Sequence, residues 1–133
     1  MKRFTDDQYS KLWRIAAFYN FFASAIMLIF PQFSAKLVLQ AGAVNDFYAH
    51  TFYNFTWAFV MIFGIGYFIV SLDVNKNHGV ALLGILGKVF FYLYYLKLYF
   101  GSHCTLFGLA GVTGDLLFSI AFSYFLYQKK VLD

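Results

Sequence analysis

Four long apolar segments most constrain what this chain can fold into. They run over about Leu12–Phe30, Phe52–Leu72, Val80–Phe100 and Leu106–Tyr127. Each is close to the ~20 residues that a helix needs to cross the hydrocarbon core of a bilayer. Lipid offers the backbone no hydrogen bonds, and the alternating pattern of a barrel is missing. We therefore expect one all-α domain over residues 1–133, a transmembrane four-helix bundle.

The amino-acid composition also indicates that lipid is the solvent for these segments. The chain is 62% hydrophobic and 12% charged, whereas soluble domains average about 45–50% apolar and about 25% charged residues. A soluble domain of 133 residues has too little interior to bury so much apolar surface. The net charge of +4 is not arranged as a basic stripe. We therefore expect membrane lipid, and no nucleic acid, as a partner.

Basic residues gather on one side of the predicted bundle. They precede the first segment, separate the second from the third, and follow the fourth: Lys2, Arg3, Lys11, Arg14, Lys76, Lys129 and Lys130. The other side carries Lys36 and Lys97. The positive-inside rule then predicts that both termini are cytoplasmic. Asp6 and Asp7 in the basic start, with no cleavage site after the apolar run, indicate a retained helix rather than a signal peptide.

The connection between the first two segments, residues 32–51, is the only long loop in the predicted arrangement. Its apolar residues Phe33, Leu37 and Val38 follow helical spacing. We expect a short interfacial helix here, which either lies on the outer membrane surface or folds back over the bundle.

Lys88 and Asp115 are ionisable residues near the centres of the third and fourth segments. Such groups are costly at membrane depth and usually face the bundle interior with a partner. A short loop joins the two segments, so they should be antiparallel neighbours. At a rise of about 1.5 Å per residue, their difference in depth is within the reach of a lysine side chain. The sequence therefore predicts a buried Lys88–Asp115 ion pair.

Further polar residues lie at similar depth and share helical faces with small residues. The candidates for lining an intramembrane pocket are Asn20, Ser24, Asn54, Tyr92, Tyr95 and Ser119. Small residues let membrane helices approach closely, and polar ones hydrogen-bond across the contact. Two interpretations of the ion pair remain. It fixes which helices face each other, or it lines a pocket for an amphiphile or handles protons.

No sequence pattern identifies a reaction or a cofactor. His50 and His103 are expected on the outer side, with Cys104 beside His103, and are weak candidates for a metal or haem. No acidic or cysteine cluster with ligand spacing accompanies them, so we predict no metal site. No Ser–His–Asp set or pair of carboxylates can be recognised either. Whether the protein is an enzyme is therefore left open.

Three stretches carry a family resemblance. The segments "FYNFFASAIMLIFP", "GILGKVFF" and "GVTGDLLFSIAFSYFL" resemble the small four-helix bacterial membrane proteins grouped loosely with the DoxX-like families. The resemblance implies a four-helix bundle in a bacterial inner membrane. Some members of such families are accessory subunits of quinone-linked oxidoreductases or help cofactor maturation. No catalytic residue follows from the resemblance.

Three functions are compatible with these features. The first is a small integral membrane protein that binds a lipid- or quinone-like amphiphile at Lys88 and Asp115, with Asn20, Tyr92 and Tyr95 orienting its polar end. The second is a non-catalytic accessory subunit that docks onto a larger membrane complex. The third is a small proton-coupled transporter, which a chain with four helices would form as a homodimer.

Overall fold

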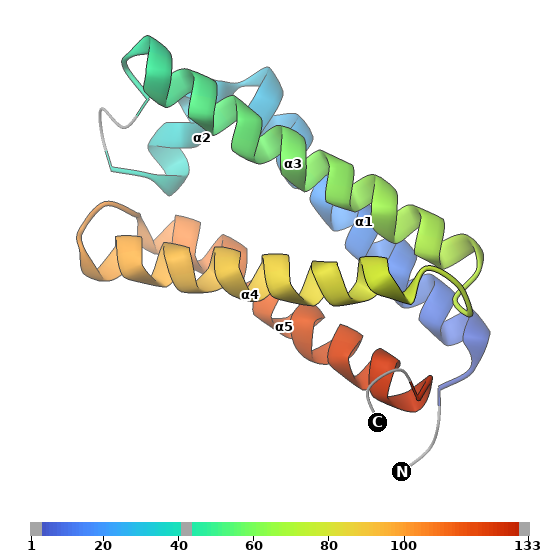
Figure 1. Cartoon of the computed structure of the whole chain (residues 1–133). Coiled ribbons are helices and arrows are strands. Elements are labelled where there is room, and N and C mark those ends of the chain that lie inside the picture. The colour runs from blue at the N-terminus through green and yellow to red at the C-terminus, as the bar shows by residue number, and fades with distance from the viewer. Residues whose placement is uncertain (1–3, 41–43, 131–133) are drawn as a thin grey trace.

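The computed structural model describes residues 4–40 and 44–130, which form five helices (Figure 1). They are α1 (Asp6–Ile29), α2 (Pro31–Val38), α3 (Phe47–Leu72), α4 (His78–Phe100) and α5 (Leu106–Gln128). All except the short α2 are long and apolar enough to cross a membrane. The predicted all-α four-helix bundle is confirmed, and the chain is a small integral membrane protein. The basic residues Lys2 and Arg3 lie outside the described part of the chain.

Two spanning helices begin earlier than predicted because well-capped turns precede their apolar segments. α1 starts at Asp6, where Thr5 and Gln8 form a reciprocal capping box. α3 starts at Phe47, where the Asp46 carboxylate accepts a hydrogen bond of 2.9 Å from the backbone N–H three residues further on. Hydropathy does not register such turns, whereas α4 and α5 begin within two residues of their apolar segments.

The four long helices form two antiparallel hairpins. α1 packs along α3, and α4 packs along α5, while the contact between α3 and α4 is limited. In Figure 1, α3 and α4 converge toward the end that holds both chain termini, here called the terminal end, and separate toward α2. The bundle is therefore closed at one end and spread at the other.

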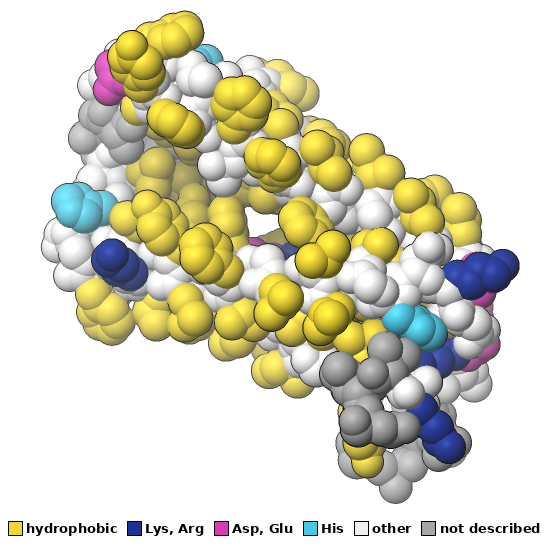
Figure 2. All heavy atoms as spheres, viewed as in Figure 1, with side chains coloured by type: hydrophobic (Ala, Val, Ile, Leu, Met, Phe, Trp, Pro, Cys, Tyr) yellow, Lys and Arg dark blue, Asp and Glu magenta, His cyan; other side chains and the backbone are white. Residues whose placement is uncertain are grey.

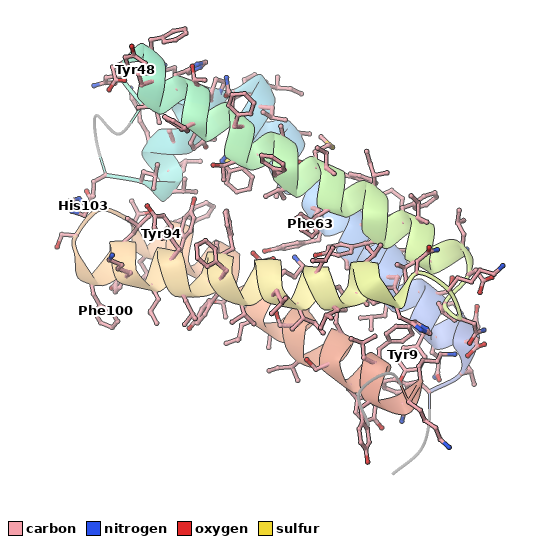
Figure 3. The ribbon with its side chains drawn as sticks, in the orientation of Figure 1. Tyr9, Tyr48, Phe63, Tyr94, Phe100 and His103 are labelled. Atoms are coloured by element: carbon pink, nitrogen blue, oxygen red, sulfur yellow. The ribbon has the colours of Figure 1, made fainter. Side chains whose placement is uncertain are left out.

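Aromatic side chains join the two hairpins near the terminal end. Trp13 of α1 stacks on Phe122 of α5 with ring centroids 3.9 Å apart. Tyr67 of α3 meets the same Phe122 ring at 5.2 Å. Closer to the termini, the Tyr9 hydroxyl donates a hydrogen bond of 2.6 Å to Gln128, and Figure 3 shows Tyr9 beside the chain ends. These bulky rings hold the hairpins together and also keep their backbones apart.

The exposed faces of the spanning helices are apolar, as lipid contact requires. Phenylalanines such as Phe22, Phe55 and Phe90 are at least 60% exposed. Figure 2 shows hydrophobic side chains along the length of α3 and α4, with most charged side chains near the two ends of the bundle. This distribution matches a protein whose middle is surrounded by hydrocarbon.

α2 folds back over the bundle, which is one of its two predicted placements. It packs against α1, α3 and α5, and its buried residues are Ser34, Ala35 and Val38. The Val38 carbonyl accepts a hydrogen bond of 3.0 Å from the Thr105 N–H at the start of α5. Gly108 permits this contact, because a Cβ at that position would collide with the Val38 carbonyl oxygen.

The single cysteine of the chain reports on how tightly α2 is seated. Cys104 is 2% exposed, and burial raises the pKa of its thiol. We expect maleimide to label Cys104 slowly. The labelling rate of an ordinary thiol, with a pKa of about 8.5, levels off above that pH, whereas the rate for Cys104 should continue to rise. A raised pKa leaves less thiolate at any given pH, so the rate profile moves to higher pH.

Replacing Gly108 with valine should unseat α2 and accelerate this labelling about tenfold or more, because a loss of about 1.4 kcal/mol raises the open population tenfold. The matched control is Gly79→Val, since a Cβ at Gly79 meets nothing within 4 Å. Equal labelling rates in the two variants would show that Gly108 does not seat α2.

Candidate functional site

A cavity of about 670 Å³ lies between the two hairpins and is lined by all five helices. It extends from Tyr67 near the aromatic core to Ser34 and Val38 on α2. Figure 2 shows the molecule hollowed between α3 and α4, with an acidic and a basic side chain visible in the depth of the hollow. The spread of the hairpins therefore creates an internal space at membrane depth.

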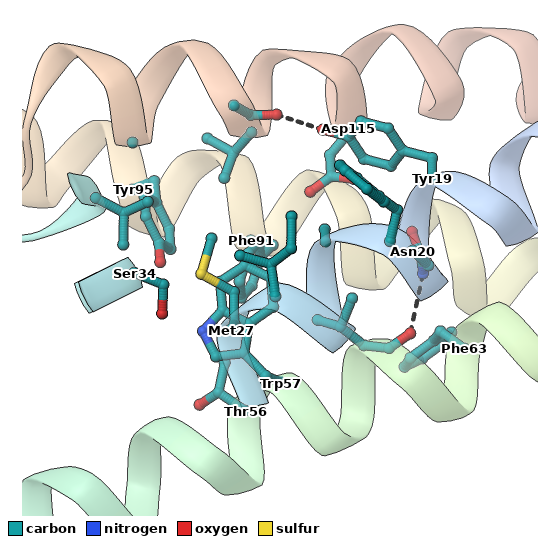
Figure 4. Close-up of a pocket in the computed structure, with 18 of the residues that line it drawn as sticks. Tyr19, Asn20, Met27, Ser34, Thr56, Trp57, Phe63, Phe91, Tyr95 and Asp115 are labelled. Carbon is teal, nitrogen blue, oxygen red and sulfur yellow. Dashed lines mark hydrogen bonds between the residues drawn. The ribbon is translucent and has the colours of Figure 1, made fainter. Parts of the chain in front are cut away.

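Lys88 and Asp115 lie in the wall of this cavity as a buried ion pair. Their side chains come from the middle of α4 and α5, and the residues are only 5% and 7% exposed. Lys88 Nζ also donates a hydrogen bond of 3.1 Å to Asn20 Oδ1 on α1. Asn20 Nδ2 in turn donates to the Val60 carbonyl of α3 at 3.1 Å, as the dashed line in Figure 4 shows. One polar network thus connects all four spanning helices.

Three aromatic rings surround the Lys88 ammonium. Its nitrogen lies 5.5 Å from the ring centroid of Tyr19, 5.4 Å from that of Tyr67 and 5.3 Å from that of Phe118. Ring faces at this distance attract a cation, and more strongly where water is excluded. The ion pair, the amide of Asn20 and these rings together offset the cost of burying the charge.

Gly84 and Gly114 leave the space that the rings of Tyr67 and Tyr19 occupy. A Cβ at Gly84 would lie 2.7 Å from Cε1 of Tyr67. A Cβ at Gly114 would lie 2.8 Å from the hydroxyl oxygen of Tyr19. The Tyr19 hydroxyl donates a hydrogen bond to the carbonyl of Gly111, so its ring is held between α1 and α5. The small residues of α4 and α5 therefore position the rings around Lys88.

Several polar atoms of the cavity wall have unused hydrogen-bonding capacity. Among the described residues, the Lys88 ammonium makes two hydrogen bonds, to Asn20 and Asp115, although it carries three donors. The side-chain hydrogen bonds within that same set include none for Asp115 Oδ2 or for the hydroxyls of Tyr67 and Tyr95, and all three residues line the cavity. Apart from these groups, the wall is predominantly apolar.

Four phenylalanines mark the openings of the cavity toward lipid. Phe22, Phe33, Phe59 and Phe107 line the cavity and are all more than 60% exposed. A side chain that is both lining and exposed must lie at a rim. Since these residues come from α1, α2, α3 and α5, the cavity opens sideways between helices rather than only at a bundle end.

The structure brings together four of the predicted site residues. Lys88, Asp115, Asn20 and Tyr95 all line the cavity, and Figure 4 shows Asn20, Tyr95 and Asp115 around the same space. Tyr95 lies further toward α2 than the ion pair. The predicted polar site is therefore assembled from α1, α4 and α5.

Ser24 and Ser119 were predicted to line the pocket, but they lie outside it. Each hydroxyl donates to a carbonyl one turn earlier on its own helix, at 2.6 Å to Asn20 and 2.8 Å to Asp115. Serine in a membrane helix readily takes this local bond. Both hydroxyls therefore have a backbone partner on their own helix, and that of Ser24 also lies 3.5 Å from Met61 Sδ on α3.

Tyr92 and Asn54 also do not line the cavity. Tyr92 packs beside a cluster of buried residues that includes Cys104 and Val112, at the α2 side of the hairpin of α4 and α5. The Asn54 amide nitrogen lies 3.3 Å from His50 Nδ1 on the same helix, α3. Both residues belong to the predicted polar faces, but rotation of α3 and α4 about their axes turns them away from the cavity.

The two histidines do not assemble a metal site. His103 is exposed in the connection between α4 and α5, as labelled in Figure 3, whereas His50 pairs with Asn54. Within residues 4–40 and 44–130, no group of three or more His, Cys, Asp or Glu side chains is placed to hold a metal ion.

Sequence reasoning missed the aromatic rings and the part played by α2. Tyr19, Tyr67 and Ser34 all reach the cavity, but none of them was a candidate. A signal exists for Tyr67, which continues the face of α3 defined by Trp57 and Val60 at three- and seven-residue spacing. The rings were hidden among the chain's 19 phenylalanines and 11 tyrosines.

Comparisons of this chain with protein-family models, curated proteins and solved structures found no match.

Proposed function

We propose that this small membrane protein binds a lipid- or quinone-like amphiphile in the cavity between its hairpins. The amphiphile's polar end meets Lys88 and Asp115, Asn20 and the Tyr95 hydroxyl help to orient it, and its apolar part lies along the wall toward α2. The single observation that carries the proposal is the 670 Å³ cavity with an ion pair in its wall.

The dimensions and chemistry of the cavity support this proposal. Ligand sites are typically clefts of about 300–1,000 Å³ with mostly apolar walls and a few convergent polar groups. The cavity matches both features. In an accessory subunit that needs the ion pair only for helix pairing, side chains would fill the space between the helices at this depth. The open space beside Lys88 therefore favours binding over the accessory role and over a purely structural pair.

Orientation and compartment form part of the proposal. Among the described residues, Lys11 of α1, Lys76 of the α3–α4 connection and Lys129 after α5 belong to the terminal end, where Lys129 pairs with Asp6 and donates a hydrogen bond to Asn75. By the positive-inside rule this end faces the cytoplasm of a bacterial inner membrane, and α2 lies toward the outer side. The cavity then reaches from mid-membrane to the outer leaflet.

Mass spectrometry of the purified protein tests the proposal. Native spectra, followed by organic extraction, should show about one amphiphile per chain in the wild-type protein, enriched over the bulk membrane lipid. The double variant Lys88→Met/Asp115→Leu should lose it, because the polar anchor is gone while the cavity walls remain. Extracts that match bulk lipid in both proteins would contradict a specific site.

A further inference from the structure

We infer that the site selects an uncharged amphiphile with one chain, whose head is a carbonyl or hydroxyl group. This inference rests on the proposed function and names the class of ligand. It follows from three properties of the cavity: its charge balance, its unused hydrogen bonds and its volume.

The charges in the cavity wall are already balanced. Lys88 and Asp115 are the only charged residues that line it in the described structure, and they form an ion pair. A carboxylate or phosphate head would have to displace Asp115 from Lys88 and leave the aspartate stranded in an apolar space. A cationic head would strand Lys88 in the same way. An unpaired buried charge is costly, so a neutral head is favoured.

The unused hydrogen bonds suit a small neutral head. The third N–H of Lys88 and the Tyr67 hydroxyl can donate to a carbonyl oxygen, while Asp115 Oδ2 can accept from a hydroxyl. Tyr67 lies beside Lys88, with its ring centroid 5.4 Å from Nζ. A carbonyl or hydroxyl in this corner makes the missing bonds without breaking the ion pair.

The volume of the cavity limits the size of the chain. At about 30 Å³ for each water-sized group, 670 Å³ holds on the order of 22 non-hydrogen atoms. One chain of about 16–18 carbons with a small head fits whole within this volume, whereas the two acyl chains of a membrane phospholipid would extend out of it past the rims. Entry occurs sideways from the bilayer, past the rim that Phe59 marks on α3.

Tryptophan fluorescence provides a direct test, because the two tryptophans lie in different places. Trp57 lines the cavity, whereas Trp13 is fully buried in the aromatic core and does not line it. The variant Trp13→Phe leaves Trp57 as the reporter, and the matched variant Trp57→Phe leaves Trp13 as the control. Bromine atoms on an alkyl chain quench a tryptophan that they contact.

The probes share one chain and differ in the charge of the head. They are 9,10-dibromooctadecanol, 9,10-dibromooctadecanoate and (9,10-dibromooctadecyl)trimethylammonium. Decylubiquinone, which has a shorter chain and no bromine, serves separately as a competitor with a carbonyl head. Relative to the Trp13 control, we expect the alcohol to quench Trp57 at a concentration at least about tenfold below that of either ion. Competition between decylubiquinone and the alcohol in native mass spectra then compares carbonyl with hydroxyl heads.

Each outcome separates this inference from the proposed function. If an ionic probe quenches Trp57 as well as the alcohol does, and Lys88→Met weakens it, amphiphile binding stands but neutral selection is overturned. If no probe quenches Trp57 beyond the Trp13 control, the proposed function itself fails. Should Trp13→Phe not fold, competition between the same probes for the wild-type protein in native mass spectra gives the same decision.

Discussion

Replacing Lys88 with methionine is expected to lower the free energy of unfolding by about 3–5 kcal/mol, because it strands the Asp115 carboxylate in an apolar space. Methionine has nearly the length of the lysine stem, so packing changes little. Asp115 makes its only side-chain hydrogen bond to Lys88 among the described residues, and Asn20 Oδ1 loses the donor that Lys88 supplies. The loss is measured as a shift of the unfolding transition in detergent, followed by circular dichroism.

The reciprocal change and the double variant turn this into a test of partnership. Asp115→Leu alone should destabilise by a similar amount, since it strands the ammonium of Lys88. The double variant Lys88→Met/Asp115→Leu should recover at least about 2 kcal/mol over the worse single variant, because no buried charge remains. Lys97→Met, at an exposed position of α4, is the matched control and should have no measurable effect. A double variant no more stable than the worse single would refute the partnership.

Filling the cavity is expected to abolish binding while leaving the fold intact. Gly87 and Gly111 line the cavity from α4 and α5. A Cβ at Gly87 comes no closer than 3.5 Å to Phe63, and one at Gly111 meets nothing within 4 Å. Leucine at either position should reduce bound amphiphile about tenfold or more, since overlap with the ligand costs at least about 1.4 kcal/mol. The readout is amphiphile per chain in native mass spectra.

The control for the filling experiment is Gly79→Leu, which adds the same group to α4 outside the cavity. All three leucine variants should be as stable as the wild type or more so, because helical glycine is disfavoured by about 1 kcal/mol. A filled cavity that still carries its amphiphile would place the ligand elsewhere on the protein.

The two experiments together separate a structural ion pair from a ligand site. If the ion pair only fixes helix pairing, the Lys88 and Asp115 variants should change stability as described, but leucine at Gly87 or Gly111 should not change the amount of bound amphiphile. A ligand site responds to both sets of variants. The same comparison distinguishes binding from a proton-coupled role, in which the ionisable groups matter and the volume of the cavity does not.

The features of this protein that depend on position along the chain could be predicted from its residues alone. The apolar lengths specified four spanning helices, and helical spacing in the loop indicated α2. The Lys88–Asp115 pairing was also predictable, because two short-linked antiparallel helices place residues counted from their joined ends at matching depths. A charged residue at membrane depth usually needs a nearby residue of opposite charge as its partner.

The surroundings of that ion pair, by contrast, depend on how the helices pack together. The splay of the hairpins depends on how Trp13 and Phe122 space the backbones and on where α2 is seated, and neither follows from local periodicity. Helix rotation placed Tyr67 in the cavity and turned Tyr92 away from it. The Ser24 hydroxyl donates to the backbone of its own helix and lies 3.5 Å from Met61 Sδ of α3, so it is buried in the bundle without lining the cavity. A helical face predicted from spacing is broad, and the packing of bulky aromatic residues selects which part of it meets the cavity.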